Sequence, residues 1–234
     1  MMRTYDQGEH SSAVWAGVSD TLEKIETLDF LDRLAAGDLD ARSFVNYIHQ
    51  DGLYLNGYAK AMSLLAAKAP TAQESRFWNR SAADAVEAET AMHADLLADE
   101  QFAKVSEEIA PGGAAKASPT TLGYVSYLVA TAATEPYEVG VAGVLPCFWV
   151  YAHMGKVLVG RAGDLTANPY AAWVQAYDSP EFDSAVVDAV TLYERCAAGT
   201  TEEGRRRMAE AFAQATVYEL HFWATSAALQ DWSV

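Results

Sequence analysis

A cysteine and a tyrosine lie one helical turn apart in the most apolar part of the sequence. Cys147 follows directly after Pro146, and Tyr151 comes four residues later. A proline inside a helix removes one backbone hydrogen bond and clashes with the preceding turn, so we expect a bend that can aim the thiol into a cavity. At a spacing of four residues, the phenol lies over the same helical face as the sulfur. The pair has the chemistry of a nucleophile beside a proton donor.

Two carboxylates interrupt apolar stripes elsewhere in the chain. Asp51 shares a helical stripe with Tyr58, with Tyr54 between them, and Glu219 precedes Phe222 on the last stripe. Carboxylates are rarely buried without partners, because removing an ion from water costs several kcal/mol. A thiol, two carboxylates and several tyrosines that all face inward from separate helices predict a polar cavity inside a helical bundle.

Each of these groups, taken alone, has a simpler explanation. Asp51 could bond to tyrosine phenols, and Glu219 could pair with the arginines at 205–207. Structural networks also bury charge. Cys147 could be a small buried hydrophobe, and Cys196 is expected to pack on an amphipathic helix near Gly199.

Metal and nucleotide sites have weaker support. Glu89 and His93 have a spacing of four residues, whereas a di-iron centre of the ferritin type uses Glu-x-x-His on two helices. We therefore interpret them as a pair on one helix face or as support for another site residue. The remaining histidines show no ligand spacing, and the chain has no glycine-rich phosphate loop. We expect no cofactor and no metal.

Composition limits the partners and the compartment. The chain has 234 residues, 51% of them hydrophobic, and a formal net charge of −16. Such a surface repels phosphate backbones, so nucleic acid is not an expected partner. The N-terminus does not resemble a signal peptide, and the longest uncharged run, residues 139–152, is shorter than the roughly 20 residues that cross a membrane. Two cysteines make no disulfide framework. We predict a cytoplasmic protein with one domain over residues 1–234, and no membrane partner.

The elements that must position these groups are helices. Alanine is abundant, and no segment shows sustained two-residue alternation. Helix starts and breaks are indicated at Gly37, Asp40, Ser118–Pro119, Glu135–Pro136, Asn168–Pro169 and Ser179–Pro180, and residues 200–203 fit a capping box. The prediction is an all-α, single-domain bundle of about seven or eight helices, with the last running to about Trp232.

Four blocks of this sequence resemble the TenA / thiaminase II family. They cover residues 44–55, 145–151, 170–177 and 218–223, and they occur in the order found in that family. The resemblance spans nearly the whole chain, and Cys147 places it in the branch that has the cysteine. It implies a fold like that of haem oxygenase, without haem and assembled as a homotetramer. The departures are Gly52, where a larger residue is common, and the segment 94–117.

The resemblance also implies an activity. Family members release 4-amino-5-hydroxymethyl-2-methylpyrimidine from aminomethylpyrimidine or from thiamin. Carried over to this chain, Cys147 adds to the pyrimidine ring, Glu219 transfers protons, and Asp51 holds the amino group and a ring nitrogen. Tyr151 acts with them in orienting ring and water. The other implied substrate-binding residues are Tyr54, Tyr58, Tyr124, Tyr177 and Phe222.

Three other functions remain open from the residues alone. One is a transcription regulator, which the acidic surface and the lack of a helix-turn-helix signal disfavour. Another is a pyrimidine-binding protein without turnover, which would not need Cys147. The last is a di-metal oxidase on the same scaffold, for which Asp51, Glu89, His93 and Glu219 are the candidate ligands.

Overall fold

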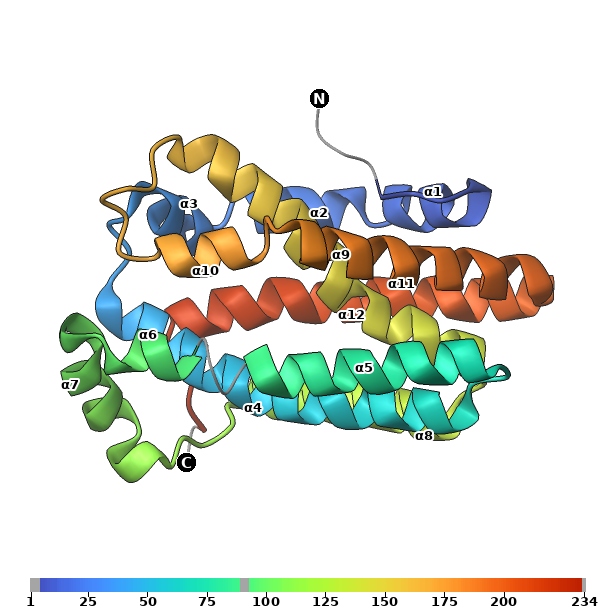
Figure 1. The fold of residues 1–234 in the computed structure, drawn as a ribbon, viewed down its shortest axis with the longest axis horizontal. Coiled ribbons are helices and arrows are strands. Elements are labelled where there is room, and N and C mark those ends of the chain that lie inside the picture. The colour runs from blue at the N-terminus through green and yellow to red at the C-terminus, as the bar shows by residue number, and fades with distance from the viewer. Residues whose placement is uncertain (1–4, 89–92, 233–234) are drawn as a thin grey trace.

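The computed structural model describes residues 5–88 and 93–232, and within these ranges all regular secondary structure is helical (Figure 1). The first half contains α1 (Glu9–Ala16), α2 (Ser19–Glu26), α3 (Asp29–Ala36), α4 (Ala41–Lys68), α5 (Ala72–Ala88), α6 (Ala94–Ala98) and α7 (Glu100–Ile109). After a short 3₁₀ turn at Pro111–Gly113 come α8 (Pro119–Thr134), α9 (Tyr137–Ala162), α10 (Ala171–Ala176), α11 (Pro180–Gly199) and α12 (Glu202–Ala227). The all-α prediction is confirmed.

Side-chain caps begin three of the long helices where the sequence predicts them. Asp40 accepts a hydrogen bond from the Ser43 amide at 3.0 Å and begins α4. Ser118 and Ser179 do the same for α8 and α11, each followed by a proline at the first helical position. Such caps satisfy amides that have no partner inside the helix.

Several predicted boundaries differ from those observed. The N-terminal stripe is divided into three short helices, so the described residues form more helices than the seven or eight predicted. Thr201 caps α12 through the Gly204 amide, in place of the predicted box at 200–203. The last helix ends at Ala227, well before Trp232. Asn168 lies outside α10 and instead donates to the carbonyls of Leu34 and Ala35 at the end of α3.

Helix α9 is the central helix of the bundle. It contacts α2, α3, α4, α8, α10, α11 and α12, and in Figure 1 it crosses between the α4–α5–α8 group and the α10–α11 group. By length and composition it could cross a membrane, yet 78% of its apolar window is buried inside the protein, as in the core helix of a soluble protein. The helix continues through Pro146 without a break, so the predicted bend does not interrupt it.

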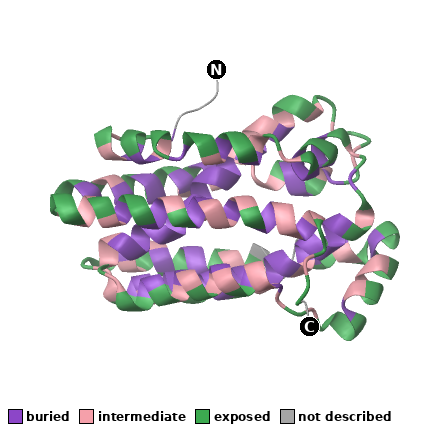
Figure 2. Ribbon diagram, turned by 180° about the vertical axis from the view of Figure 1, so that it is seen from behind, coloured by how far each residue is buried: buried purple, intermediate pink, exposed green. Residues whose placement is uncertain are grey.

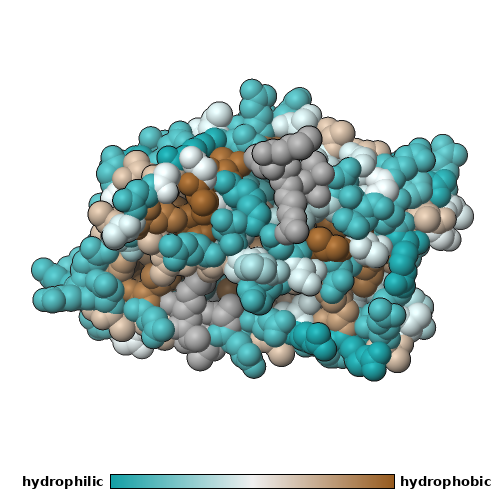
Figure 3. All heavy atoms as spheres, turned by 45° about the horizontal axis from the view of Figure 1, so that its top comes forward, coloured by the Kyte–Doolittle hydropathy of each residue, from teal (hydrophilic) through white to brown (hydrophobic). Residues whose placement is uncertain are grey.

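Burial follows the helical periodicity that the sequence shows. Buried residues follow the inward sides of the long helices, and exposed residues cover their outer sides (Figure 2). Hydrophilic side chains dominate the face in Figure 3, with apolar side chains visible between them. The buried hydrophobic residues from α1 through α12 form one continuous core cluster, which holds the functional groups in fixed positions.

Candidate active site

A cavity of about 360 Å³ opens between α4, α5, α9 and the α10–α11 connection. Five residues singled out from the sequence line it: Asp51, Tyr58, Cys147, Tyr151 and Tyr177. The prediction that Cys147 and Tyr151 share a helical face is confirmed, because both side chains of α9 face this space. Its size falls within the range of small-molecule sites.

The Cys147 thiol lies deep in the protein, and the surface it retains faces the cavity. Burial raises its pKa well above the ordinary value, and the nearby Glu219 carboxylate raises it further. Hydrogen bonding to the Tyr54 and Tyr58 phenols acts in the opposite direction. At neutral pH the sulfur is therefore a neutral thiol that needs a base before it can attack.

Glu219 is a buried carboxyl group on α12. It is 1% exposed, and Oε1 accepts a hydrogen bond of 2.6 Å from the Tyr124 hydroxyl. Burial raises its pKa to about 8, the Tyr124 hydrogen bond lowers it, and Asp51 raises it. Oε2 has no hydrogen-bond partner among the described residues. The arginines at 205–207 bond elsewhere, so the alternative pairing with Glu219 is wrong. A carboxyl group with a pKa near neutrality suits proton transfer.

Asp51 on α4 contacts His93, which directly precedes α6. His93 Nε2 is 3.1 Å from Asp51 Oδ2, and the two residues are 4% and 1% exposed. This is a close contact of ionisable groups, without the alignment of a hydrogen bond. His93 thus contacts a predicted site residue, as its interpretation as support for the site anticipated, and Glu89 lies outside the described residues. The alternative in which Asp51 bonds to tyrosine phenols has no such hydrogen bond to support it among the described residues.

A pair of phenols connects α4 to α9. The hydroxyls of Tyr47 and Tyr151 are 3.2 Å apart, and the Tyr177 ring lies 4.9 Å from the Tyr151 ring. Tyr47 is fully buried, and it is a site residue that the sequence reasoning did not assign. The signal that could have found it is its position four residues before Asp51 on the same helical stripe.

Aromatic rings cluster around Tyr54, beside the cavity. The Tyr54 ring lies 5.5 Å from Tyr58, 4.9 Å from Tyr124 and 5.4 Å from Phe222. The Tyr58 hydroxyl donates to the Val144 carbonyl at 2.8 Å, two residues before Pro146. Of the predicted residues, Tyr54, Tyr124, Glu219 and Phe222 are not part of the lining of the cavity. Tyr54 and Glu219 are still near enough to Cys147 to shift the thiol pKa. The Tyr54 hydroxyl is buried beside the Cys147 thiol, and its hydrogen bonding to the sulfur lowers the thiol pKa.

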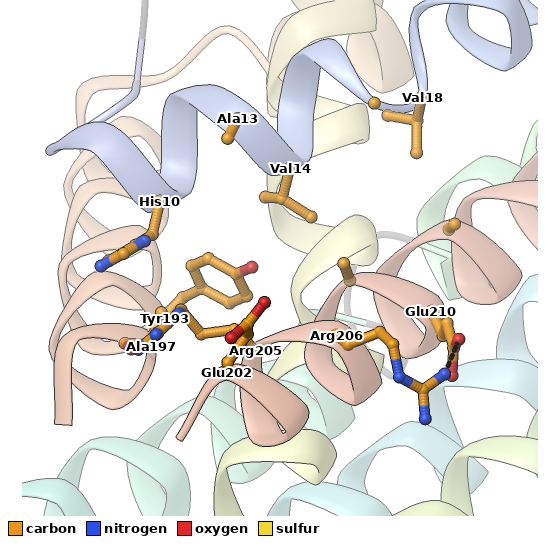
Figure 4. Close-up of a pocket in the computed structure, with 13 residues that line it drawn as sticks. His10, Ala13, Val14, Val18, Tyr193, Ala197, Glu202, Arg205, Arg206 and Glu210 are labelled. Carbon is orange, nitrogen blue, oxygen red and sulfur yellow. Dashed lines mark hydrogen bonds and ion pairs between the residues drawn. The ribbon is translucent and has the colours of Figure 1, made fainter. Parts of the chain in front are cut away.

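A larger hollow of about 590 Å³ lies elsewhere, between α1, α11 and the start of α12 (Figure 4). Its two arginines are already engaged. Arg206 pairs with Glu203 and Glu210, and Arg205 donates to the carbonyls of Ala197 and Thr200. Its lining includes neither a cysteine nor a buried carboxylate without a partner. The chemistry therefore belongs to the smaller cavity.

Potential metal ligands are not grouped in the part of the chain that the structure describes: no set of three His, Cys, Asp or Glu side chains could hold an ion there. Cys196 is half-buried beside Glu74, and burial raises its pKa to about 12. It contributes nothing to the cavity that contains Cys147.

Comparison with known proteins identifies the family. The TENA/THI-4/PQQC family model matches residues 23–229. The chain belongs to the TENA/THI-4/PQQC family. It is 31% identical over 226 residues to the thiamine biosynthesis multifunctional protein ThiED of Corynebacterium efficiens, covering 97% of this chain and 29% of that protein. It is 29% identical over 208 residues to the aminopyrimidine aminohydrolase of Bacillus subtilis, covering 87% of this chain and 84% of that protein. The chain thus spans less than a third of the ThiED protein.

Solved structures show the same fold. The TenA homologue from P. horikoshii OT3 superposes with a TM-score of 0.82 at 22% identity, covering 94% of this chain and 99% of that one. A Shewanella denitrificans domain with a heme oxygenase-like fold superposes with a TM-score of 0.72 at 14% identity, covering 92% of this chain and 90% of that one. These two structures confirm the predicted haem-oxygenase-like bundle.

Proposed function

We propose that this protein is a hydrolase of thiamin salvage that releases 4-amino-5-hydroxymethyl-2-methylpyrimidine from aminomethylpyrimidine or thiamin. The observation that carries the proposal is the cavity in which Cys147, Asp51 and three tyrosines meet, with Glu219 buried near the thiol. Membership of the family supports it, as does a relative named aminopyrimidine aminohydrolase.

In this proposal Asp51 and the aromatic rings that line the cavity bind the substrate. An aminopyrimidine offers an amino N–H donor beside a ring nitrogen, and the Asp51 carboxylate, which lines the cavity, provides an acceptor for it. The contact with His93 holds Asp51 in place from the protein side. Tyr58 and Tyr177 lie where they can enclose the flat ring.

The first chemical step joins sulfur to the ring. The Cys147 proton passes through Glu219 to a ring nitrogen while the sulfur bonds to the carbon beside the substituted one. This breaks the aromaticity, and the exocyclic C–N bond then cleaves with its electron pair leaving on nitrogen. Water adds its oxygen to the exocyclic carbon, the C–S bond breaks, and the ring proton returns to the sulfur. The proton lost by the water passes to the amine leaving group, or to solvent when the leaving group is the neutral thiazole of thiamin. The net change is substitution of a nitrogen group by hydroxyl.

Glu219 suits this role because its pKa of about 8 lets it accept and return a proton near neutrality. The raised pKa of Cys147 means that the thiolate forms only while the proton is being taken up. Tyr151, hydrogen-bonded to Tyr47, is placed to orient the incoming water.

The direct test is Cys147→Ser, assayed for pyrimidine release from aminomethylpyrimidine and from thiamin. We expect kcat to fall by about 100-fold or more, because a serine hydroxyl is a far weaker nucleophile at neutral pH. Binding of the product pyrimidine, followed by calorimetry, should change little. Turnover at the parent rate would contradict the nucleophilic role, and absence of turnover in the parent would favour a binding protein instead.

We also propose an oligomeric state and a cellular compartment for this protein, on the basis of its resemblance to the family. We expect a homotetramer in the cytoplasm, and sedimentation equilibrium of the purified protein tests the assembly. A mass near that of a single 25.3 kDa chain would contradict it.

A further inference from the structure

The face of α9 that carries Cys147 continues for two more turns. Cys147, Tyr151 and Gly155 follow one another at intervals of four residues and so form one row on the helix. Cys147 and Tyr151 line the cavity, whereas Gly155 offers no side chain. The row therefore ends in a gap on the helix surface.

The backbone of Tyr177 fills that gap. A Cβ atom added to Gly155 would lie 2.5 Å from the Tyr177 carbonyl oxygen and 2.8 Å from its carbonyl carbon. Contacts this short with backbone do not occur, so Gly155 is what allows the α10–α11 connection to rest on α9. The Tyr177 ring then lies 4.9 Å from Tyr151, above the wall that holds the thiol.

Ion pairs fasten the same connection from the next residue of α9. Lys156 pairs with Asp178, which follows Tyr177, and with Asp183 on α11, where Nζ is 2.9 Å from Oδ1. The Lys156 side chain is 19% exposed. Burial alone would lower its pKa, but hydrogen bonds to Asp178 and Asp183 outweigh that and raise the pKa. The lysine is therefore charged over the whole working range of pH.

The N-terminal segment joins this group. The Tyr5 hydroxyl donates to Asp183 Oδ1, and Tyr5 is 3% exposed. A residue that precedes the first helix thus bonds to the carboxylate that Lys156 also holds. We refer to Tyr5, Lys156, Asp178 and Asp183, together with the Gly155 contact, as the Lys156 clamp.

We propose that the Lys156 clamp positions Tyr177 over Cys147 and keeps the α10–α11 wall of the cavity closed. The connection between α10 and α11 contributes Tyr177 and Ser179 to the cavity, and the first turn of α11 contributes Glu181 and Phe182. Because α10 has only six residues, this wall depends on its attachment to α9. These are positioning residues and do not contact the substrate. The inference rests on the proposed function only where it concerns turnover.

The principal variant is Lys156→Met, which keeps the length of the side chain and removes its charge. A displacement of about 1 Å at a reacting group can cost up to about 100-fold in rate. We expect kcat for pyrimidine release to fall by about tenfold, with KM changing by less than about threefold. Lys156→Arg retains the charge and should restore kcat to within about threefold of the parent.

A second readout does not require turnover. Alkylation of Cys147 by iodoacetamide, followed by mass spectrometry of its peptide, reports access to the cavity. Lys156→Met and Gly155→Ala should each increase this rate by about threefold or more at the same pH. Cys196, which lies in a different part of the molecule, is the internal standard, and its rate should stay the same.

The matched control is Lys68→Met. Lys68 is also partly buried and bonds to the carbonyls of Ala132 and Glu135, away from the cavity. We expect Lys68→Met to lower thermal stability without changing kcat or Cys147 alkylation.

Two outcomes would overturn the proposed role of the Lys156 clamp. One is an equal effect of Lys156→Met and Lys68→Met, and the other is unchanged alkylation of Cys147 in both Lys156→Met and Gly155→Ala. If Lys156→Met does not fold, Tyr5→Phe and Asp178→Asn take its place under the same criteria. Absence of turnover in the parent would contradict the proposed function but leave the alkylation result to decide on the clamp.

Discussion

At the scale of single residues, the site is controlled by two groups that the fold keeps neutral. Glu219 is 1% exposed and has a pKa of about 8, and burial raises the pKa of Cys147 as well. Both shifts have desolvation as their largest cause. A neutral carboxyl group and a neutral thiol can exchange a proton with a substrate without leaving a charge in the core.

Glu219 should make the folding free energy depend on pH. Its pKa is raised from 4.5 to about 8, so between these values the folded protein holds a proton that the unfolded chain releases. The contribution of Glu219 to the free energy of unfolding is fully present below pH 4.5 and is lost as the pH rises to about 8. The free energy of unfolding then falls by at most about 1.4 kcal/mol per pH unit. In Glu219→Gln this loss is absent, so the variant should gain stability relative to the parent as pH rises from 5 to 8.

Urea unfolding at several pH values measures this difference. Glu202→Gln, an exposed carboxylate at the start of the same helix, is the control and should show a constant offset from the parent. The prediction fails if the Glu219→Gln curve stays parallel to that of the parent over this range.

At the scale of helices, close contacts of α4 with α8 and α9 set the spacing between the long helices of the bundle. The starts of α4, α8 and α11 could be predicted because a cap and its amide are near neighbours in sequence. The distances between helices could not be predicted, because they depend on side chains that come together from distant segments of the chain. Gly57 is such a case, since a side chain there would overlap the Val125 methyl groups of α8.

Two glycine substitutions should therefore have opposite effects on stability. Gly57→Ala forces α4 and α8 apart and is expected to lower the free energy of unfolding by about 1–3 kcal/mol. Gly160→Ala in α9 meets open space and should raise it by about 0.5–1 kcal/mol, because alanine favours the helix. Urea midpoints at constant slope provide the measurement. Destabilisation by Gly160→Ala, or none by Gly57→Ala, would refute this account of the packing.

At the scale of the whole molecule, the charge distribution favours cations at the cavity. The net charge is −16, and the cavity is lined by the carboxylates Asp51, Asp84 and Glu181. Of the described side chains that line it, none is lysine, arginine or histidine. A cleft with charges of one sign concentrates ligands of the other sign. Thiamin and protonated aminomethylpyrimidine are cations, whereas phosphorylated forms would be repelled.

The double variant Asp84→Asn/Glu181→Gln tests this selectivity. We expect kcat/KM for thiamin to fall by about three- to tenfold at low ionic strength, and its dependence on salt to weaken, because both carboxylates are exposed and screened. The matched control neutralises two exposed carboxylates of α2, Asp20→Asn/Glu23→Gln. An equal loss in both double variants would show that only net charge matters, and no loss in either would contradict steering at the cavity.

The sequence by itself determined the all-α class, the caps of α4, α8 and α11, and Cys147, Asp51 and Glu219 as candidate reactive groups. These follow from periodicity and from polar residues on apolar stripes, which are local properties of the chain. Only the tertiary structure decided which groups face the cavity, with Tyr177 in its lining and Phe222 outside it. The contact of Asp51 with His93, and the attachment of the α10–α11 connection to α9, join segments far apart in sequence. Their formation depends on how the helices rotate and pack against one another, which no single helical pattern specifies.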